Sequence, residues 1–361
     1  MKTEENTSNV VVFRPACAST SGMGHLKRCI SIANGLPKTL SIAFAISYQN
    51  RNFLSQFLER PDAEIILVGD KLSINELSKY PEQTRAVVLD IADNLHVTNK
   101  DLVTNYLREL NKSEVRSVVI DGIFSDTIKS KNTPAVNILI KPYIEATSVE
   151  PNYGEVNFIG EKAIILGNEY SARTRIKKAS RNGPALISFG GSDPDKLTEK
   201  ICDLINKSKR MRRQRFIVVL GTNFDTDRVK KIQKHTSKCE NIELVQTQPS
   251  LREIYEASRF AIIGSGATTR YEAAICGLPV LILSATPKHD NACKSYEKFN
   301  CAKYLSYINC RPCYQVESAM LHLIYNNRTI NTYRQNALKL KIGENISVFN
   351  EALNKMISDA R

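Results

Sequence analysis

A histidine framed by glycines stands near the start of the chain, in Gly22-Met23-Gly24-His25, directly before an apolar helical pattern. We predict a helix over 24–36, so that backbone N–H groups and the positive end of the helix dipole face whatever binds there. The same dipole favours the neutral imidazole, which can accept a proton. The pattern therefore predicts His25 as a general base, with a capping or packing histidine as the alternative.

A second group of small and hydroxyl residues, Gly264 to Thr269, opens a predicted helix in the second half of the chain. Closely spaced N–H groups at such a turn can bind a pyrophosphate. Glu272 follows within that helix and could accept hydrogen bonds from both hydroxyls of a ribose. Asn291 belongs to a predicted loop after the next strand. The alternative interpretation is a tight helix–strand packing motif.

The elements around the histidine alternate between short apolar strands and helices. We predict strands at 9–14, 40–47, 65–68, 87–90 and 118–122, weaker strands at 135–140 and 163–166, and helices at 24–36, 51–58, 73–79 and about 100–110. Buried strands that alternate with helices require a parallel sheet covered on both faces. The first half is therefore predicted to be a doubly wound α/β domain.

The second half repeats this alternation. We predict strands at 185–189, 216–220, 242–245, 260–263 and 279–283, and helices at 195–207, 250–257, 270–276, 315–325, 329–340 and 346–357. Residues 168–184 are rich in Arg, Lys, Ser, Asn and Gly and are predicted to connect the halves. The expected organisation is an N-terminal domain over 1–167, a linker over 168–184 and a C-terminal domain over 185–361.

The composition narrows the class of protein. A length of 361 residues favours two domains, and 42% hydrophobic residues suffice for packed cores. The net charge of +13 is compatible with nucleic acid, an anionic membrane or a phosphorylated substrate. The basic residues are dispersed and no nucleic-acid-binding module is recognised, so we expect no nucleic-acid partner. No apolar run of membrane-spanning length and no signal peptide are recognised, so we expect a cytoplasmic protein, with its nine cysteines mostly buried and reduced.

The stretch from Gly264 to Glu272 resembles the nucleotide-sugar signature of two-domain GT-B proteins related to the MurG glycosyltransferase. The chain is more closely similar to the PseG family of UDP-sugar hydrolases, which make the free sugar precursor of pseudaminic acid, and to its spore-coat polysaccharide relatives. The matching positions are Arg14, Gly22, Gly24, His25, Arg28 and Cys29, together with the Ser-Phe-Gly-Gly-Ser-Asp-Pro turn at Ser188 to Pro194. Fainter similarity extends over most of the chain.

This resemblance implies a GT-B fold, with two Rossmann-like domains facing a cleft and UDP bound on the second domain. The implied site residues are Gly266, Ala267 and Thr268 at the diphosphate, Glu272 at the ribose, Gly190, Gly191 and Ser192 lining the cleft, and Arg14, Gly22, Gly24 and Asn291 as further substrate-binding positions. His25 would activate the attacking water. The resemblance implies no metal ion and no other cofactor.

Three positions depart from the family pattern on the side that faces the sugar. Ala16 replaces an aspartate, Ala18 replaces a serine, and Ala92 stands where the family has a tyrosine. The first hypothesis is a hydrolase that releases UDP from a UDP-linked amino or deoxy sugar in surface-glycan biosynthesis, of the kind that leads to nonulosonic acids. The second is a GT-B glycosyltransferase of polysaccharide assembly, which would contact an anionic membrane peripherally. The third is a non-catalytic binder of sugar nucleotides.

Overall fold

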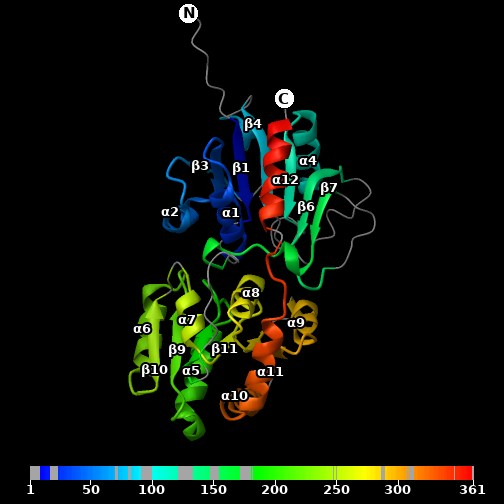
Figure 1. Cartoon of the computed structure of the whole chain (residues 1–361). Helices are drawn as coiled ribbons and strands as arrows, with labels where there is room; N and C mark the ends of the chain where they lie inside the picture. The colour runs from blue at the N-terminus through cyan, green and yellow to red at the C-terminus, as the bar shows by residue number, and fades with distance from the viewer. Residues whose placement is uncertain are drawn as a thin grey trace, which may run out of the picture. The chain divides into compact units, whose positions relative to one another are not determined.

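The computed structural model describes residues 9–16, 23–69, 72–79, 83–90, 100–120, 133–146, 154–170, 180, 182–246, 248, 250–285, 289–306, 308, 313–344 and 346–359. The chain divides into two compact units (Figure 1). Unit 1 is Met1–Asn168 together with Gly343–Arg361, and unit 2 is Glu169–Ile342.

Unit 1 is built on a seven-stranded parallel sheet of order β3-β2-β1-β4-β5-β6-β7. Its strands are β1 (Val10–Pro15), β2 (Ser41–Ile46), β3 (Glu64–Leu67), β4 (Thr84–Asp90), β5 (Arg116–Ile120), β6 (Val136–Lys141) and β7 (Gly154–Ile159). Its helices are α1 (Gly24–Gly35), α2 (Arg51–Phe57), α4 (Lys100–Lys112) and α12 (Ile346–Asp359), with short 3-10 turns η1 (Tyr48–Asn50), η2 (Ile74–Leu77) and η5 (Glu161–Ala163). The central strand β1 is buried along its whole length, because helices cover both faces of the sheet.

The last helix, α12, belongs to unit 1 although it follows unit 2 in the sequence. Phe349, Leu353 and Ile357 are buried in the core that also contains β1 and α1. The ring of Phe349 meets that of Phe158 edge-on at 5.6 Å. This differs from the expected C-terminal domain of 185–361, because an amphipathic pattern does not say which sheet its apolar face will cover.

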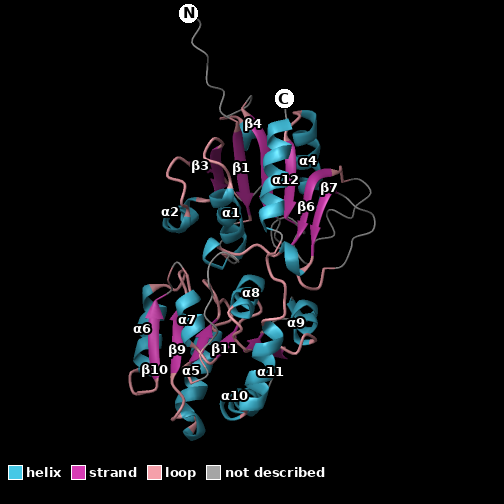
Figure 2. Cartoon of the chain, viewed as in Figure 1, coloured by secondary structure: helices cyan, strands magenta, loops and turns pink. Residues whose placement is uncertain are grey.

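Unit 2 is built on a six-stranded parallel sheet of order β10-β9-β8-β11-β12-β13. Figure 2 distinguishes the strands and helices of the two units by colour. Its strands are β8 (Ala185–Ser188), β9 (Phe216–Leu220), β10 (Ile242–Gln246), β11 (Phe260–Ile263), β12 (Val280–Leu283) and β13 (Ala302–Leu305). Its helices are α5 (Leu197–Lys207), α6 (Thr226–Thr236), α7 (Arg252–Ala257), α8 (Ala267–Ile275), α9 (Asp290–Glu297), α10 (Cys313–Tyr325) and α11 (Asn327–Ala337), and η7 (Lys209–Met211) follows α5. Another 3-10 turn, η6 (Asn168–Tyr170), spans the boundary between the units.

The predicted α/β alternation is confirmed in both units, with local corrections. The strand predicted at 163–166 is wrong: residues 161–163 form the 3-10 turn η5, and the seventh strand is β7, which precedes it. Strand β7 was missed because most of it is only half-buried or exposed, so its apolar pattern is weak. Helix α6 was missed for the same reason, since only Ile232 and Thr236 are buried along it. Most of the predicted linker, 171–179 and 181, lies outside the described residues.

Both sheets have the doubly wound order, in which the first strand of the unit lies beside the fourth. In each unit the chain first adds strands on one side of the first strand and then crosses to its other side. This switch in strand order lies between β1 and β4 in unit 1, and between β8 and β11 in unit 2. In open parallel sheets, ligands bind beyond the carboxyl ends of the strands at such a point. We therefore expect ligand-binding residues close to the carboxyl ends of these four strands.

Candidate functional site

In unit 1, His25 lies against an aspartate at the carboxyl edge of the sheet. Asp90 is the last residue of β4 and pairs in register with Pro15, the last residue of β1. The chain continues from β1 to α1, where His25 is the second residue of the helix. As a result, Nδ1 of His25 lies 2.7 Å from Oδ1 of Asp90.

Arg28 holds the same aspartate from one helical turn further along α1. Its Nε donates to Oδ2 of Asp90 at 2.9 Å, and its Nη2 donates to Oδ1 at 2.8 Å. Burial alone would raise the pKa of Asp90, but Arg28 and His25 outweigh burial and hold that pKa below its usual range. For Arg28 the signs are opposite: burial alone would lower its pKa, but the neighbouring Asp90 outweighs burial and raises that pKa above its usual value. The pair is therefore ionised, and Asp90 can only accept hydrogen bonds.

This arrangement fixes the orientation of the imidazole. Nη2 of Arg28 also lies 2.9 Å from Nδ1 of His25. The two contacts make opposite demands on Nδ1, because the anionic Oδ1 at 2.7 Å calls for a proton there and the Arg28 donor at 2.9 Å calls for a lone pair. We assign the proton to Nδ1, since a lone pair facing the carboxylate at the shorter distance costs more; the contact with Arg28 is then not a hydrogen bond. Nε2 then carries the free lone pair, and the side chain of His25 remains 20% exposed. His25 is thus an oriented imidazole able to accept a proton.

Arg14, a predicted substrate-binding residue, is 2% exposed. Its Nε forms an ion pair with Oε2 of Glu76 at 2.9 Å, and its Nη2 donates to the main-chain oxygen of Gly69 at 2.8 Å. Burial raises the pKa of Glu76, and Arg14 opposes this rise. These contacts bind β1 to the segments after β3, and a role for Arg14 in binding substrate stays a prediction.

The remaining predicted positions of unit 1 lie around α1. Gly24 is the first residue of that helix, and no described side chain caps it. Gly22 lies outside the described residues, as do Ala18 and Ala92. Ala16 is buried, and its N–H donates to the main-chain oxygen of Asp90 at 3.0 Å. The family's aspartate is absent at position 16, but the fold still places an aspartate, Asp90, beside His25.

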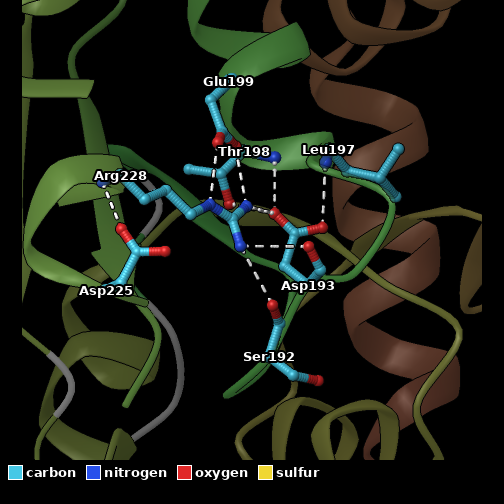
Figure 3. Close-up of polar contacts among 7 residues, drawn as sticks. All are labelled: Ser192, Asp193, Leu197, Thr198, Glu199, Asp225 and Arg228. Carbon is cyan, nitrogen blue, oxygen red and sulfur yellow. Dashed lines mark hydrogen bonds and ion pairs between the residues drawn. The ribbon is translucent and has the colours of Figure 1, made fainter. Parts of the chain in front are cut away.

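In unit 2, the turn between β8 and α5 is filled by its own aspartate. Asp193 has a left-handed φ of +38° and is 3% exposed. Its carboxylate accepts from the N–H groups of Leu197 and Thr198, at 2.9 and 3.0 Å, and from Oγ1 of Thr198 at 2.8 Å (Figure 3). It therefore occupies the donors at the start of α5 that would otherwise be available to a ligand.

Arg228 of α6 closes this turn from the other side. Its Nη2 pairs with Asp193 at 2.7 Å and with Glu199 at 2.7 Å (Figure 3). Its Nη1 donates to the main-chain oxygens of Ser192 and Asp193, at 3.0 and 3.1 Å. The guanidinium also lies 3.6 Å from the ring centre of Phe224.

These contacts orient the predicted residues Gly190, Gly191 and Ser192. The oxygen of Gly191 accepts from the N–H of Asn223 at 2.9 Å, and the oxygen of Ser192 faces Arg228. In a trans peptide the next N–H points away from the carbonyl. The N–H groups of Ser192 and Asp193 are therefore directed away from β9 and α6. Gly190 supplies a φ of +81° at the start of the turn, which favours glycine.

The turn between β11 and α8 is built differently. Gly266 is the N-cap residue of α8, with no side-chain cap among the described residues and no acidic residue in the first turn. Gly266 is exposed, and Ala267 and Thr268 are half-buried. Oγ of the neighbouring Ser265 lies 2.9 Å from Nδ1 of His289. The start of α8 thus presents N–H groups and a positive dipole end that an anion can occupy.

The other two predicted residues of unit 2 lie on helices. Glu272 is 4% exposed, and its Oε2 accepts from the hydroxyl of Tyr255 at 3.1 Å. Burial, followed by Glu272, raises the pKa of Tyr255, so the phenol stays protonated and donates. Asn291 is exposed and is the second residue of α9, which corrects the loop expected there. Both ligand assignments stay predictions.

The sequence did not predict two features of these sites: the pairing of Asp90 with His25, and the contact of Arg228 with the first glycine turn. The first could have been found, because an acid that ends the fourth strand of a doubly wound sheet lies beside the loop after the first strand. No sequence signal identifies Arg228, which lies on a helix with a weak apolar pattern. Among the described residues, no cluster of His, Cys, Asp and Glu could hold a metal ion.

Comparisons with known proteins agree with this architecture. No protein-family model matches the sequence. The chain is 27% identical over 273 residues to an uncharacterized protein of Methanocaldococcus jannaschii, MJ1062, and the match covers 73% of this chain and 53% of that protein. The chain therefore spans about half the length of this relative. It is 22% identical over 289 residues to the spore coat polysaccharide biosynthesis protein SpsG of Bacillus subtilis, covering 76% of this chain and 77% of that protein.

The fold is shared with a solved structure. The crystal structure of MurG from Acinetobacter baumannii matches with a TM-score of 0.65 and 11% identity, and the match covers 96% of this chain and 99% of that one. No helix in the described part of this chain has the length and apolar character needed to cross a membrane. The chain consists of two parallel-sheet α/β domains of the GT-B type, and it is distantly homologous to SpsG.

Proposed function

We propose that this protein is a nucleotide-sugar hydrolase that releases UDP from a UDP-linked amino or deoxy sugar in the biosynthesis of a surface polysaccharide. The observation that carries the proposal is the His25–Asp90–Arg28 cluster, in which a buried ionised carboxylate orients an accessible imidazole. The distant relationship to SpsG, a spore coat polysaccharide biosynthesis protein, supports the pathway class. The resemblance of the Gly264 to Glu272 stretch to nucleotide-sugar signatures supports the donor.

In the proposed reaction, Nε2 of His25 takes a proton from a water molecule. The water oxygen then bonds to the anomeric carbon or to the β-phosphorus. Attack at carbon breaks the bond from that carbon to oxygen, and its electron pair leaves on the UDP β-phosphate. Attack at phosphorus breaks the bond from phosphorus to that oxygen, and the pair leaves with the sugar. The products in both cases are UDP and the free sugar. Asp90 stabilises the imidazolium that forms, since its carboxylate is already ionised.

We assign the nucleotide diphosphate to the start of α8, because no described side chain caps its N–H groups and because the stretch from Gly264 to Glu272 resembles nucleotide-sugar signatures. The start of α5 is already occupied by Asp193. Glu272 is proposed as the ribose contact, which requires its buried carboxylate to exchange the hydroxyl of Tyr255 for those of the ribose or to share it.

A GT-B glycosyltransferase is the second candidate, favoured by the fold shared with MurG and by Ala16 in place of an acid. The same imidazole could take the proton from an acceptor hydroxyl instead of from water. The two candidates differ in what receives the sugar.

UDP release from a panel of UDP-amino sugars, measured with and without a carbohydrate acceptor, separates these candidates. Hydrolysis predicts release without acceptor, with ¹⁸O from labelled water in the sugar after attack at carbon and in UDP after attack at phosphorus. Transfer predicts release only with acceptor and no label in either product.

His25→Ala is expected to reduce the rate by about 10²–10⁴-fold, the usual contribution of a general base. His235→Ala is the matched control, because that imidazole is exposed on α6 and lies in the other unit. Release that is undiminished by His25→Ala would remove the proposed base, and absence of release from every UDP-sugar tested would leave a binding protein.

A further inference from the structure

Unit 2 carries a concentrated basic segment between α5 and β9. Six lysines and arginines stand among the nine residues 207–215, and no acidic residue occurs between Asp203 and Asp225. The six are Lys207, Lys209, Arg210, Arg212, Arg213 and Arg215, and all are exposed. We call this surface the basic face. It corrects the expectation that the basic residues are dispersed.

The basic face is held in a fixed shape. Met211, in the middle of the segment, is fully buried in the core of unit 2. Nδ2 of Asn241 donates to the main-chain oxygens of Met211 and Gln214, at 3.1 and 2.9 Å. The turn is therefore pinned to the sheet, and the cations on either side of Met211 are displayed outward by a folded element.

Among the residues that the structure describes, most of these cations have no acidic partner. Lys207 pairs with Asp203 at 2.6 Å. The other five form no ion pair with any residue that the structure describes. Elsewhere in unit 2, arginines such as Arg228 and Arg252 are paired with glutamates. An unpaired cluster of like charges repels itself, so its presence points to an external anion.

The proposed substrate does not account for this charge. The turns after β8 and β11 follow the carboxyl ends of their strands, whereas residues 208–215 precede β9 and lie at the amino edge of the same parallel sheet. A strand of this length spans about 17 Å. Figure 1 shows α8 at one end of unit 2 and α10, which contacts the basic face, at the opposite end. The substrate's phosphates would bind at the other edge.

Two exposed tyrosines of α10 border the basic face. The hydroxyl of Tyr325 donates to the main-chain oxygen of Arg210 at 2.8 Å, and its side chain is 64% exposed. Tyr314 is 65% exposed and lies one turn before Glu317, which accepts from Oγ of Ser208. Tyrosine is an amphipathic side chain that is enriched at the surface of membranes.

We propose that the basic face, with Tyr314 and Tyr325 at its margin, docks unit 2 onto an anionic lipid bilayer. Clustered lysines and arginines bind anionic headgroups additively, and flanking aromatic rings enter the headgroup layer. Single-stranded nucleic acid would instead favour aromatic rings interleaved with the cations for base stacking, whereas the two tyrosines of this face lie at its margin and residues 207–215 contain none. This inference does not depend on the proposed reaction.

Sedimentation of the whole protein with vesicles tests the proposal. Vesicles of phosphatidylcholine with about one-third phosphatidylglycerol are compared with pure phosphatidylcholine at low and high salt. The triple variant Arg210→Gln, Arg212→Gln, Arg213→Gln is expected to lower the partition coefficient on anionic vesicles at least tenfold. The control Lys230→Gln, Lys231→Gln, Lys234→Gln removes the same charge from α6 and is expected to change it less than twofold.

Equal losses in both triple variants would overturn the proposal, because net charge would then explain the binding. Equal binding to neutral vesicles, or no binding to either kind, would also overturn it. Retention on single-stranded DNA that exceeds retention on vesicles at the same salt, and that is lost in the arginine variant, would assign the face to nucleic acid instead. Matched thermal unfolding curves confirm that both variants are folded.

Discussion

The two glycine-containing turns of unit 2 connect a buried strand to a helix in the same way, yet they differ in what occupies the start of the helix. The turn between β8 and α5 contains Asp193, which caps the helix and pairs with Arg228. The turn between β11 and α8 has Gly266 at the corresponding place and no side-chain cap among the described residues. A glycine turn is open to an outside anion only when no acid of its own fills it.

Removing the internal acid should have the largest effect. Asp193→Ala leaves two helix N–H groups and part of the Arg228 guanidinium without a partner, so we expect a loss of about 3–5 kcal/mol in the free energy of unfolding. Urea denaturation measures it. Asp225→Ala removes the exposed cap of α6 and should cost only about 1 kcal/mol. Similar losses of stability in the two variants would mean that the buried contacts of Asp193 with α5 and Arg228 stabilise the fold no more than an exposed helix cap does.

The pH dependence of stability extends the comparison to Asp90, which is also buried against an arginine but caps no helix. Arg28 and His25 lower the pKa of Asp90, so its stabilisation is present at neutral pH and is lost as the pH falls below about 4. Burial raises the pKa of Asp193 despite its hydrogen bonds, so its contribution changes in the opposite direction, above about pH 4.

Denaturation of the asparagine variants between about pH 3 and 6 checks these signs. Asp90→Asn should make the acid loss of stability shallower than in the unmodified protein, and Asp193→Asn should make it steeper. Slopes that shift in the same direction for both variants would contradict the assignment of the two carboxylates.

An aspartate at the N-cap of α8 should occupy the N–H groups of that helix, as Asp193 does at the start of α5. Gly266 has φ −61° and ψ 133°, and a Cβ there would meet nothing within 4 Å, so Gly266→Asp fits without strain. We expect it to stabilise the fold by about 0.5–1 kcal/mol while weakening UDP binding at least tenfold by calorimetry. Gly266→Ala adds a side chain without charge and should leave the affinity within about threefold. Unchanged affinity in the aspartate variant would remove the diphosphate from α8.

A smaller effect is expected at the proposed ribose contact. Glu272→Gln keeps the size of the side chain and one acceptor oxygen, so UDP binding should weaken by about 1–2 kcal/mol through loss of charge-assisted hydrogen bonds. Tyr255→Phe removes the hydroxyl that donates to Glu272 and should leave the affinity equal or slightly higher, because that hydroxyl no longer competes with the ribose for the carboxylate. Affinity for UDP that is unaffected by Glu272→Gln would place the ribose elsewhere.

The sequence predicted the parts of the fold that depend on local pattern. Buried runs such as 10–15 and 260–263 identify their strands, and small residues identify the starts of α1 and α8. The pattern could not show that the apolar face of α12 covers the sheet of unit 1, because that contact joins segments far apart in the chain. It also could not show that Asp193 fills its own turn, since the aspartate precedes the donors by four and five residues across a left-handed backbone.

Because α12 packs on unit 1, the two units can complete their folding only in a fixed order during synthesis. Unit 2 is continuous in sequence from 169 to 342, whereas the core of unit 1 receives Phe349, Leu353 and Ile357 only after all of unit 2 has been made. We expect a chain stalled on the ribosome with residues 1–342 exposed to contain a protease-resistant unit 2 and a susceptible unit 1. The domain that begins first along the chain is therefore the one completed last.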